Sequence, residues 1–247
     1  MTDTQLSNKR IAKNTILLYV RMLLLMLVSL YTSRVVLSTL GVSDFGIYGV
    51  VGGIVSMFTF INSAMATGTQ RFLTYELGRG DQVRLRKVFS MSVNIHLLLA
   101  VLVLLLAETV GLWFFYAKMV IPAARLTAAF WVYQFSVLAT LVMILSVPYN
   151  AVIIAHERMS AFAYISIFEV VAKLLIVYLL LFSSWDRLIY YAALVLLVQL
   201  TVRFIYSFYC KKHFPESAYH WEPDRQLFRE MVGFSGWNFW GNCAAMA

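Results

Sequence analysis

The residues of this sequence that could do chemistry are charged side chains inside long apolar stretches. Glu169 and Lys173 lie near the middle of one such stretch. They are four residues apart, so on a helix they would share one face, with the glutamate before the lysine. A charge at the centre of a bilayer costs roughly 2.5–3.5 kcal/mol on insertion scales, so a pair at this depth needs a reason. Three roles stay open: a neutralised structural pair, an element that couples transport to protons or ions, and a cationic anchor in a cavity.

Four arginines also lie within apolar stretches. Arg21 and Arg34 are thirteen positions apart on one predicted helix, which places them about 140° apart around its axis. A straight helix cannot point both into one cavity. We therefore favour Arg21 as the cavity residue and expect Arg34 to meet Asp44 or the outer lipid head groups. Arg71 and Arg203 lie near predicted inner helix ends, where a long basic side chain usually extends towards the head groups.

Small and hydroxyl-bearing residues recur along the second apolar stretch and fall within an arc of about 80° on a helical wheel. The glycine end of this stripe, at Gly49 and Gly52, is explained by close helix packing, which small residues at this spacing permit. The hydroxyl and amide end favours a polar pathway with Arg71 at its inner rim. The pathway residues are Ser56, Thr59, Ser63, Thr67, Gln70 and Thr74.

Pro148 lies inside the fourth stretch and predicts a kink, because proline removes a backbone donor and clashes with the preceding turn. The 4 histidines and 2 cysteines show no metal-ligand spacing, so we expect no metal and no cofactor. No nucleotide-binding G-x-x-x-x-G-K-[ST] motif occurs. The predicted outward connections are too short to hold a catalytic domain. We therefore expect that the protein is not an enzyme.

Six long apolar stretches must position these residues. Hydrophobic residues make up 61% of the chain, charged residues 13%, and the mean hydropathy is +0.77. Each stretch exceeds the roughly 20 residues that a helix needs to cross a hydrocarbon core, where the backbone must satisfy its own hydrogen bonds. We predict an all-α fold: a polytopic membrane helical bundle of six transmembrane helices in one lobe, plus the start of a seventh. The stretches are Ile16–Leu40, Phe45–Leu73, Val88–Tyr116, Thr127–Ala155, Ala161–Ser183 and Leu188–Cys210.

The distribution of basic residues predicts the orientation. The net charge is +8, and with a cytoplasmic N-terminus 12 lysines and arginines fall in inner segments and 3 in outer ones. This bias follows the positive-inside rule, so the charge reflects topology and no nucleic-acid partner is expected. The predicted organisation is a cytoplasmic tail at 1–14, a six-helix transmembrane lobe at 15–210, a cytoplasmic linker at 211–230 and an incomplete seventh helix at 231–247.

Five motifs point to a family. They are SRVVL at 33–37 with GVSDFGIY at 41–48, TQRFL at 69–73, PYNA at 148–151, AHERM at 155–159 and FSGWN at 234–238. Together they resemble the bacterial polysaccharide-export flippases, which are O-antigen-type transporters of the multidrug/oligosaccharidyl-lipid/polysaccharide exporter superfamily. The first motif resembles the junction between the first two helices of that family. The resemblance makes Gly41, Asp44, Gly46 and Tyr48 the expected gating hairpin.

The resemblance implies two six-helix lobes around a cavity, and a sugar chain on undecaprenyl pyrophosphate that crosses the bacterial inner membrane for surface polysaccharide (lipopolysaccharide, O-antigen) synthesis. It implies that cationic cavity residues hold the pyrophosphate, with Arg21, Arg34, Arg71 and Lys173 as candidates by position. Membrane lipids are implied partners, as are a glycan polymerase or glycosyltransferases. Because the sequence holds one lobe and the start of a seventh helix, we expect a fragment of a two-lobe transporter.

Two other functions stay open. A multidrug or small-metabolite exporter of the same superfamily would favour an aromatic and acidic cavity, whereas this sequence is richer in cations. A non-transporting membrane scaffold for glycan-synthesis enzymes would affect the synthesis of lipid-linked sugar rather than its movement across the membrane.

Overall fold

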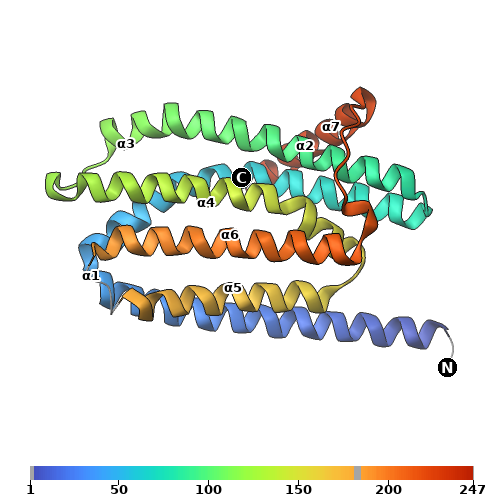
Figure 1. Cartoon of the computed structure of the whole chain (residues 1–247), viewed down its shortest axis with the longest axis horizontal. Coiled ribbons are helices and arrows are strands. Elements are labelled where there is room, and N and C mark those ends of the chain that lie inside the picture. Colours follow the sequence, from blue (N-terminus) through green and yellow to red (C-terminus); the bar gives the residue numbers. More distant parts are fainter. Residues whose placement is uncertain (1–2, 181–184, 247) are drawn as a thin grey trace.

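The computed structural model describes residues 3–180 and 185–246, without the side chains of 3–14, 56, 58–61, 239 and 242–246. All regular secondary structure in these ranges is helical, and the long helices pack into one bundle (Figure 1). This confirms the predicted all-α class. The long helices are α1 (Asp3–Arg79), α2 (Gln82–Leu106), α4 (Leu126–Ala155), α5 (Met159–Leu180), α6 (Arg187–His213) and α7 (Arg225–Met246). The short elements are a π turn (Ala107–Gly111), α3 (Leu112–Lys118) and 3-10 turns at Ala123–Arg125 and Pro215–Ser217.

Helix α1 contains the first two predicted stretches. Its backbone leaves helical geometry at Gly41, where φ is 80° and ψ is 166°. This is a conformation that glycine adopts far more readily than other residues. The chain reverses there, so the two arms of α1 run in opposite directions (Figure 1). In the described residues, five helices are long and apolar enough to cross a membrane. The sequence predicts six such stretches, and the numbers differ because α1 is counted as one helix across the bend.

The connections alternate between the two ends of the bundle as the sequence predicts. The Gly41 bend, the α3–α4 connection and the start of α6 lie at one end (Figure 1). The start of α1, the turn at Gly80, the α4–α5 turn and the end of α6 lie at the other. We call these the outer end and the inner end, after the predicted orientation. Lys173 lies on α5 between them.

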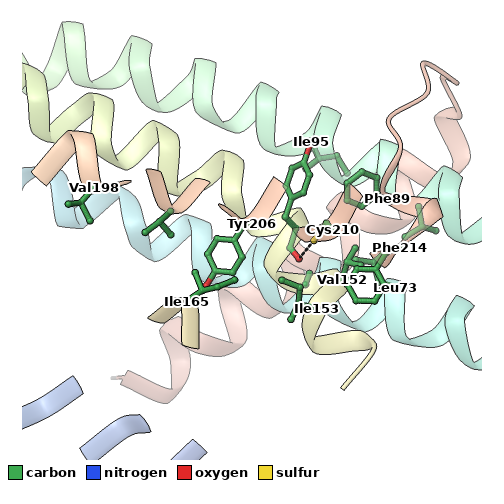
Figure 2. Packing of buried hydrophobic residues seen from close by; sticks show 14 of the residues in the cluster. Leu73, Phe89, Ile95, Val152, Ile153, Ile165, Val198, Tyr206, Cys210 and Phe214 are labelled. Atoms are coloured by element: carbon green, nitrogen blue, oxygen red, sulfur yellow. Dashed lines mark hydrogen bonds between the residues drawn. The ribbon is translucent and has the colours of Figure 1, made fainter. Parts of the chain in front are cut away.

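Helix α4 carries many of the buried side chains, including Val132, Tyr133 and Ile144, and it packs against α1, α2 and α6. Apolar residues from α1, α2, α4, α5, α6 and α7, together with Phe214, form one cluster, part of which is shown in Figure 2. Within it the Cys210 thiol donates a hydrogen bond to the Tyr149 carbonyl, with a distance of 3.4 Å. Pro148 is buried inside α4, and the predicted kink there stays a prediction.

One buried tyrosine packs against the π turn between α2 and α3 and hydrogen-bonds to its first residue. The Tyr133 hydroxyl of α4 donates a hydrogen bond to the Ala107 carbonyl at 2.7 Å. A Cβ atom at Gly111 would lie only 2.1 Å from the same hydroxyl oxygen. The tyrosine therefore fits against α2 and α3 because residue 111 has no side chain.

The predicted linker and seventh helix have different boundaries in the structure. Helix α7 begins at Arg225 rather than near Met231, because the Asp224 carboxylate accepts hydrogen bonds from the N–H groups of Gln226 and Leu227, each at 3.0 Å. Such a cap satisfies backbone donors at a helix start, and it lies outside the apolar pattern used for the prediction. The segment 211–230 therefore contains the end of α6, a 3-10 turn and the first turns of α7.

Candidate functional site

A pocket of about 470 Å³ opens between the second arm of α1, α4, α5 and α6, and we call it the Lys173 pocket. Its wall combines aromatic and aliphatic side chains with hydroxyl, amide and ammonium groups. This mixture is typical of small-molecule sites, in which a few polar groups orient a largely apolar ligand. The lining residues are Tyr48, Gly52, Val55, Phe135, Ser136, Ala139, Thr140, Met143, Lys173, Ala192, Val195 and Gln199.

The predicted pair on α5 is present and includes a third residue. The Lys173 ammonium lies 2.6 Å from Glu169 Oε1, one helical turn away. Gln199 of α6 donates a hydrogen bond from Nε2 to the same oxygen at 2.9 Å. Lys173 and Gln199 line the pocket, and Glu169 is not among the lining residues. The geometry of the ion pair is confirmed, and its role stays a prediction.

One aromatic contact and one glycine shape the pocket wall on the α1 side. The ring of Tyr48 meets the ring of Tyr191 edge to face, with centroids 4.9 Å apart. This fixes the predicted hairpin residue Tyr48 against α6, in an arrangement that aromatic pairs prefer. Gly52, one turn further along α1, lines the pocket as well. The glycine end of the predicted stripe therefore reaches the site.

Arg21 lies near the ion pair but outside the pocket lining. Its guanidinium stacks on the ring of Phe162, 4.3 Å from the ring centroid. Tyr206 interacts electrostatically with both Arg21 and Glu169, so the arginine and the carboxylate flank one tyrosine. The Nε atom of Arg21 is buried without a hydrogen-bond partner among the described side chains. The predicted assignment of Arg21 to a cavity is thus not fulfilled by this pocket.

The remaining cationic candidates do not converge on the Lys173 pocket. Arg34 is exposed on the first arm of α1. Arg71 is also exposed, and its guanidinium lies over the ring of Phe234 on α7, 4.2 Å from the centroid. Arg203 stacks in the same way on Tyr149, at 4.1 Å. Of the four predicted pyrophosphate ligands, only Lys173 lines the pocket.

The polar pathway predicted along α1 is only partly described. The side chains of Ser56 and Thr59 lie outside the described residues. Ser63, Thr67 and Thr74 are exposed and Gln70 is half-buried, with the Thr67 hydroxyl donating to the Ser63 carbonyl at 3.1 Å. Between them, at Gly68, α7 approaches closely: a Cβ atom there would lie 2.3 Å from the Ser235 hydroxyl oxygen. None of these residues lines the Lys173 pocket.

At the outer end, an arginine that the sequence analysis did not single out links α1, α4 and the start of α6. Arg125, at the start of α4, forms ion pairs with Asp44 beyond the Gly41 bend and with Asp186 before α6. Asp44 is therefore bound by Arg125 and not by Arg34, and the other role expected for Arg34, contact with the outer lipid head groups, stays a prediction. The Gly41 bend carries Asp44 to the base of α4 instead. We call this group the Arg125 clasp. Gly46 has open space beside it.

Asp186 has two roles in the Arg125 clasp. Its carboxylate also accepts hydrogen bonds from the N–H groups of Leu188 and Ile189, which caps α6. Burial raises the pKa of Asp186, but the hydrogen bonds and charge of Arg125 and the two backbone donors outweigh it, so the pKa lies below its ordinary value. The aspartate is consequently a stable anion that connects the start of α6 to α1 and α4.

At the inner end, the segment after α6 folds back onto the bundle. Glu216 is 3% exposed and pairs with Nε2 of His156, whose ring stacks on Phe214 with centroids 4.2 Å apart. Burial raises the pKa of Glu216, yet the hydrogen bond and charge of His156, a backbone donor and Arg86 together lower it below its ordinary value. The predicted linker is thus a packed element in this region. Within the described part of the chain, no group of three His, Cys, Asp or Glu residues could hold a metal ion.

The fold has known counterparts. No protein-family model matches the sequence, and no curated protein does. The chain superposes on a MATE transporter in its bent conformation with a TM-score of 0.77 and 12% identity, over 94% of this chain and 52% of the other. An outward-facing multidrug resistance MATE family transporter of the MOP superfamily gives 0.75 and 13%, over 93% and 52%. A MOP superfamily transporter from Pyrococcus furiosus, described by the reverse polarity of its binding pocket, gives 0.75 and 12%, over 94% and 52%.

These matches define the fold. The chain has the architecture of one part of a MATE-type transporter, a polytopic helical membrane bundle, and it spans about half the length of the solved structures it matches. The TM-scores of 0.77 and 0.75 establish the fold. Because the identities are only 12% and 13%, the substrate has to be inferred from the residues of this chain.

Proposed function

We propose that this chain forms one lobe of a membrane exporter, and that the Lys173 pocket is its substrate site. The observation that carries the proposal is the superposition of nearly the whole chain on MATE transporters, together with a pocket inside the lobe. The superposition on transporters supports a role in transport rather than an enzymatic one.

The proposed substrates are small amphipathic molecules of the kind that a multidrug exporter handles. One of the solved structures that this chain resembles is described as a multidrug resistance transporter. The volume of the Lys173 pocket also suits a small molecule. Phe135 and Met143 on α4 offer adaptable apolar contacts to a ligand, while Thr140 and Gln199 offer hydrogen bonds. The combination of polar and apolar groups in this wall favours a multidrug or small-metabolite exporter, one of the two alternative functions left open by the sequence.

One observation keeps a second candidate, the export of an undecaprenyl-pyrophosphate-linked oligosaccharide. The single charged group in the pocket lining is the Lys173 ammonium. A cation in the wall suits a phosphate-bearing substrate better than the organic cations for which an acidic cavity is expected. The P. furiosus transporter is described as having a binding pocket of reverse polarity that suggests a different function, which supports keeping this candidate.

Cells lacking the gene distinguish the two substrates. If the protein exports small molecules, such cells accumulate fluorescent amphipathic compounds and lose them more slowly, while lipid-linked sugars stay distributed as in the parent strain. If it moves lipid-linked oligosaccharide, these molecules accumulate on the cytoplasmic leaflet. Unchanged dye efflux and an unchanged leaflet distribution, with the protein shown to be present in the parent membrane, would refute export. A fall in lipid-linked sugar synthesis would instead support the scaffold.

A further inference from the structure

The Lys173 pocket holds two hydrogen-bond donors that meet at one oxygen. The ammonium of Lys173 and the amide nitrogen of Gln199 lie 2.6 Å and 2.9 Å from Glu169 Oε1. They come from different helices, α5 and α6, and both line the pocket. Two convergent donors, one of them charged, are the arrangement that binds an oxygen of a carboxylate or phosphate.

We propose that this pair of donors is a binding site for the acidic group of the substrate, and that Glu169 occupies it as an internal substitute when no substrate is bound. The inference rests on the proposed function, because it assigns a substrate class to the same pocket. An incoming carboxylate or phosphate oxygen accepts hydrogen bonds from the same two donors in place of Glu169 Oε1. It approaches them from the pocket, which Lys173 and Gln199 line and Glu169 does not.

The charges around Glu169 favour an anion. On α5 the carboxylate faces Lys173. On α6 it accepts a hydrogen bond from Gln199, and Tyr206 interacts electrostatically with Glu169 and with Arg21 of α1. A ligand that brings a negative charge in place of Glu169 keeps Lys173 paired, whereas an organic cation would meet the Lys173 ammonium in the wall.

Burial makes this preference strong. The side chains of Lys173 and Glu169 are 33% and 25% exposed in the isolated lobe, and both lie within a helix long and apolar enough to cross a membrane. Interactions between charges are less screened in such a place than at a water-exposed surface. The acidic group that binds here can belong to a small amphipathic acid or to a lipid pyrophosphate, since both offer the same oxygen acceptors.

Binding of two matched probes to the full chain in lipid nanodiscs tests the inference. The probes are dansyl-undecanoic acid and dansyl-undecylamine, which differ in the sign of the charged end. Glu169→Gln removes the internal anion and keeps a hydrogen-bond acceptor, so the acid should bind about 10- to 100-fold more tightly, as expected for freeing a charge-assisted contact. Lys173→Met should weaken the acid by about tenfold or more. Glu169→Gln should not tighten binding of the amine, because it removes the anion and keeps the Lys173 ammonium.

The chain offers matched controls. Glu108 is also a glutamate within a long apolar segment that accepts a hydrogen bond from a glutamine, Gln134 Nε2 at 3.4 Å, and it lies outside the pocket. Glu108→Gln and Lys118→Met should leave the affinity for both probes unchanged. If Lys173→Met does not fold, Glu169→Gln alone still decides, because its predicted effect is a gain of affinity that a damaged protein does not show.

The outcomes separate this inference from the proposed function. Unchanged or weaker acid binding in Glu169→Gln, or a wild-type chain that prefers the amine, overturns the anion site and leaves export possible. Acid binding as expected without export refutes the proposed function and leaves the site. If undecaprenyl pyrophosphate displaces the acid probe in the same nanodiscs, the site binds a lipid-linked substrate. If it does not displace the probe, the site binds small acids. Either result supports the shared chemistry.

Discussion

Removal of Arg125 should loosen the outer end of the bundle by an amount that the structure allows us to estimate. The Arg125 side chain is 28% exposed, and its partners Asp44 and Asp186 are 16% and 32% exposed. Fully exposed ion pairs contribute about 0–1 kcal/mol, whereas hydrogen bonds to charged groups inside proteins contribute about 1.5–3 kcal/mol. Because the three side chains are partly exposed, we assign about 1 kcal/mol of stabilisation to the interaction of Arg125 with each carboxylate. Arg125→Met should therefore lower the free energy of unfolding by about 2 kcal/mol.

This loss corresponds to a fall in Tm of roughly 4–8 °C for a chain of this size. Thermal unfolding of the purified chain in one detergent, followed by circular dichroism, measures it. Arg187→Met is the matched control at the same end, since Arg187 is exposed and, within the described residues, its side chain makes one hydrogen bond, 3.3 Å to the Thr39 carbonyl. Its effect should stay within about 0.5 kcal/mol.

A double-mutant cycle with Asp44→Asn identifies the contact responsible. If the clasp operates as described, the double variant Arg125→Met with Asp44→Asn is less destabilised than the sum of the single variants, by about 1 kcal/mol. High salt should reduce the effect of Arg125→Met only modestly, because the group is mostly shielded from solvent. The reasoning fails if Arg125→Met unfolds at the temperature of Arg187→Met, or if the two effects in the cycle simply add.

Two further predictions concern the inner end and the π turn. Because the pKa of Glu216 is lowered in the folded chain, its pair with His156 stabilises the folded-back segment above the ordinary glutamate pKa of about 4.3 and loses this contribution as pH falls through the lowered value. Hydrogen exchange of residues 214–222 should show protection lost below about pH 4 in the wild type, with no such step in Glu216→Gln; equal profiles would contradict the pairing. Gly111→Ala should destabilise the chain by about 1–3 kcal/mol through the clash with Tyr133, and Tyr133→Phe in the same chain should recover part of it. Additive unfolding energies would argue against that contact.

Contacts within one helix could be predicted from the sequence. The apolar stretches gave the number and placement of the spans, since crossing a bilayer requires a fixed length of apolar helix. Glu169 and Lys173 were expected to pair because residues four apart share a helix face, and they do. Gly41 was expected in a hairpin, where a backbone with positive φ favours glycine.

Contacts between helices could not be predicted in the same way, because they depend on how each helix is rotated against its neighbours. Gln199 and Arg125 are separated from their partners by 30 and 81 residues. Gln199 is the single carboxamide side chain in the sixth apolar stretch, and this was the available signal for it. The four cationic candidates share a charge, but Arg21 and Arg34 lie on the first arm of α1, Arg71 on its second arm and Lys173 on α5. Only the packed bundle shows that Lys173 alone among them enters the pocket.

Efflux from proteoliposomes tests the proposed role of this lobe most directly. The transporter that contains the lobe would be reconstituted in vesicles loaded with dansyl-undecanoic acid, and release of the probe would be followed by fluorescence. We predict protein-dependent release that Lys173→Met reduces by about tenfold or more and Lys118→Met leaves unchanged. Release that is equal with and without the protein, or that is the same in Lys173→Met as in the wild type, would contradict export through the Lys173 pocket.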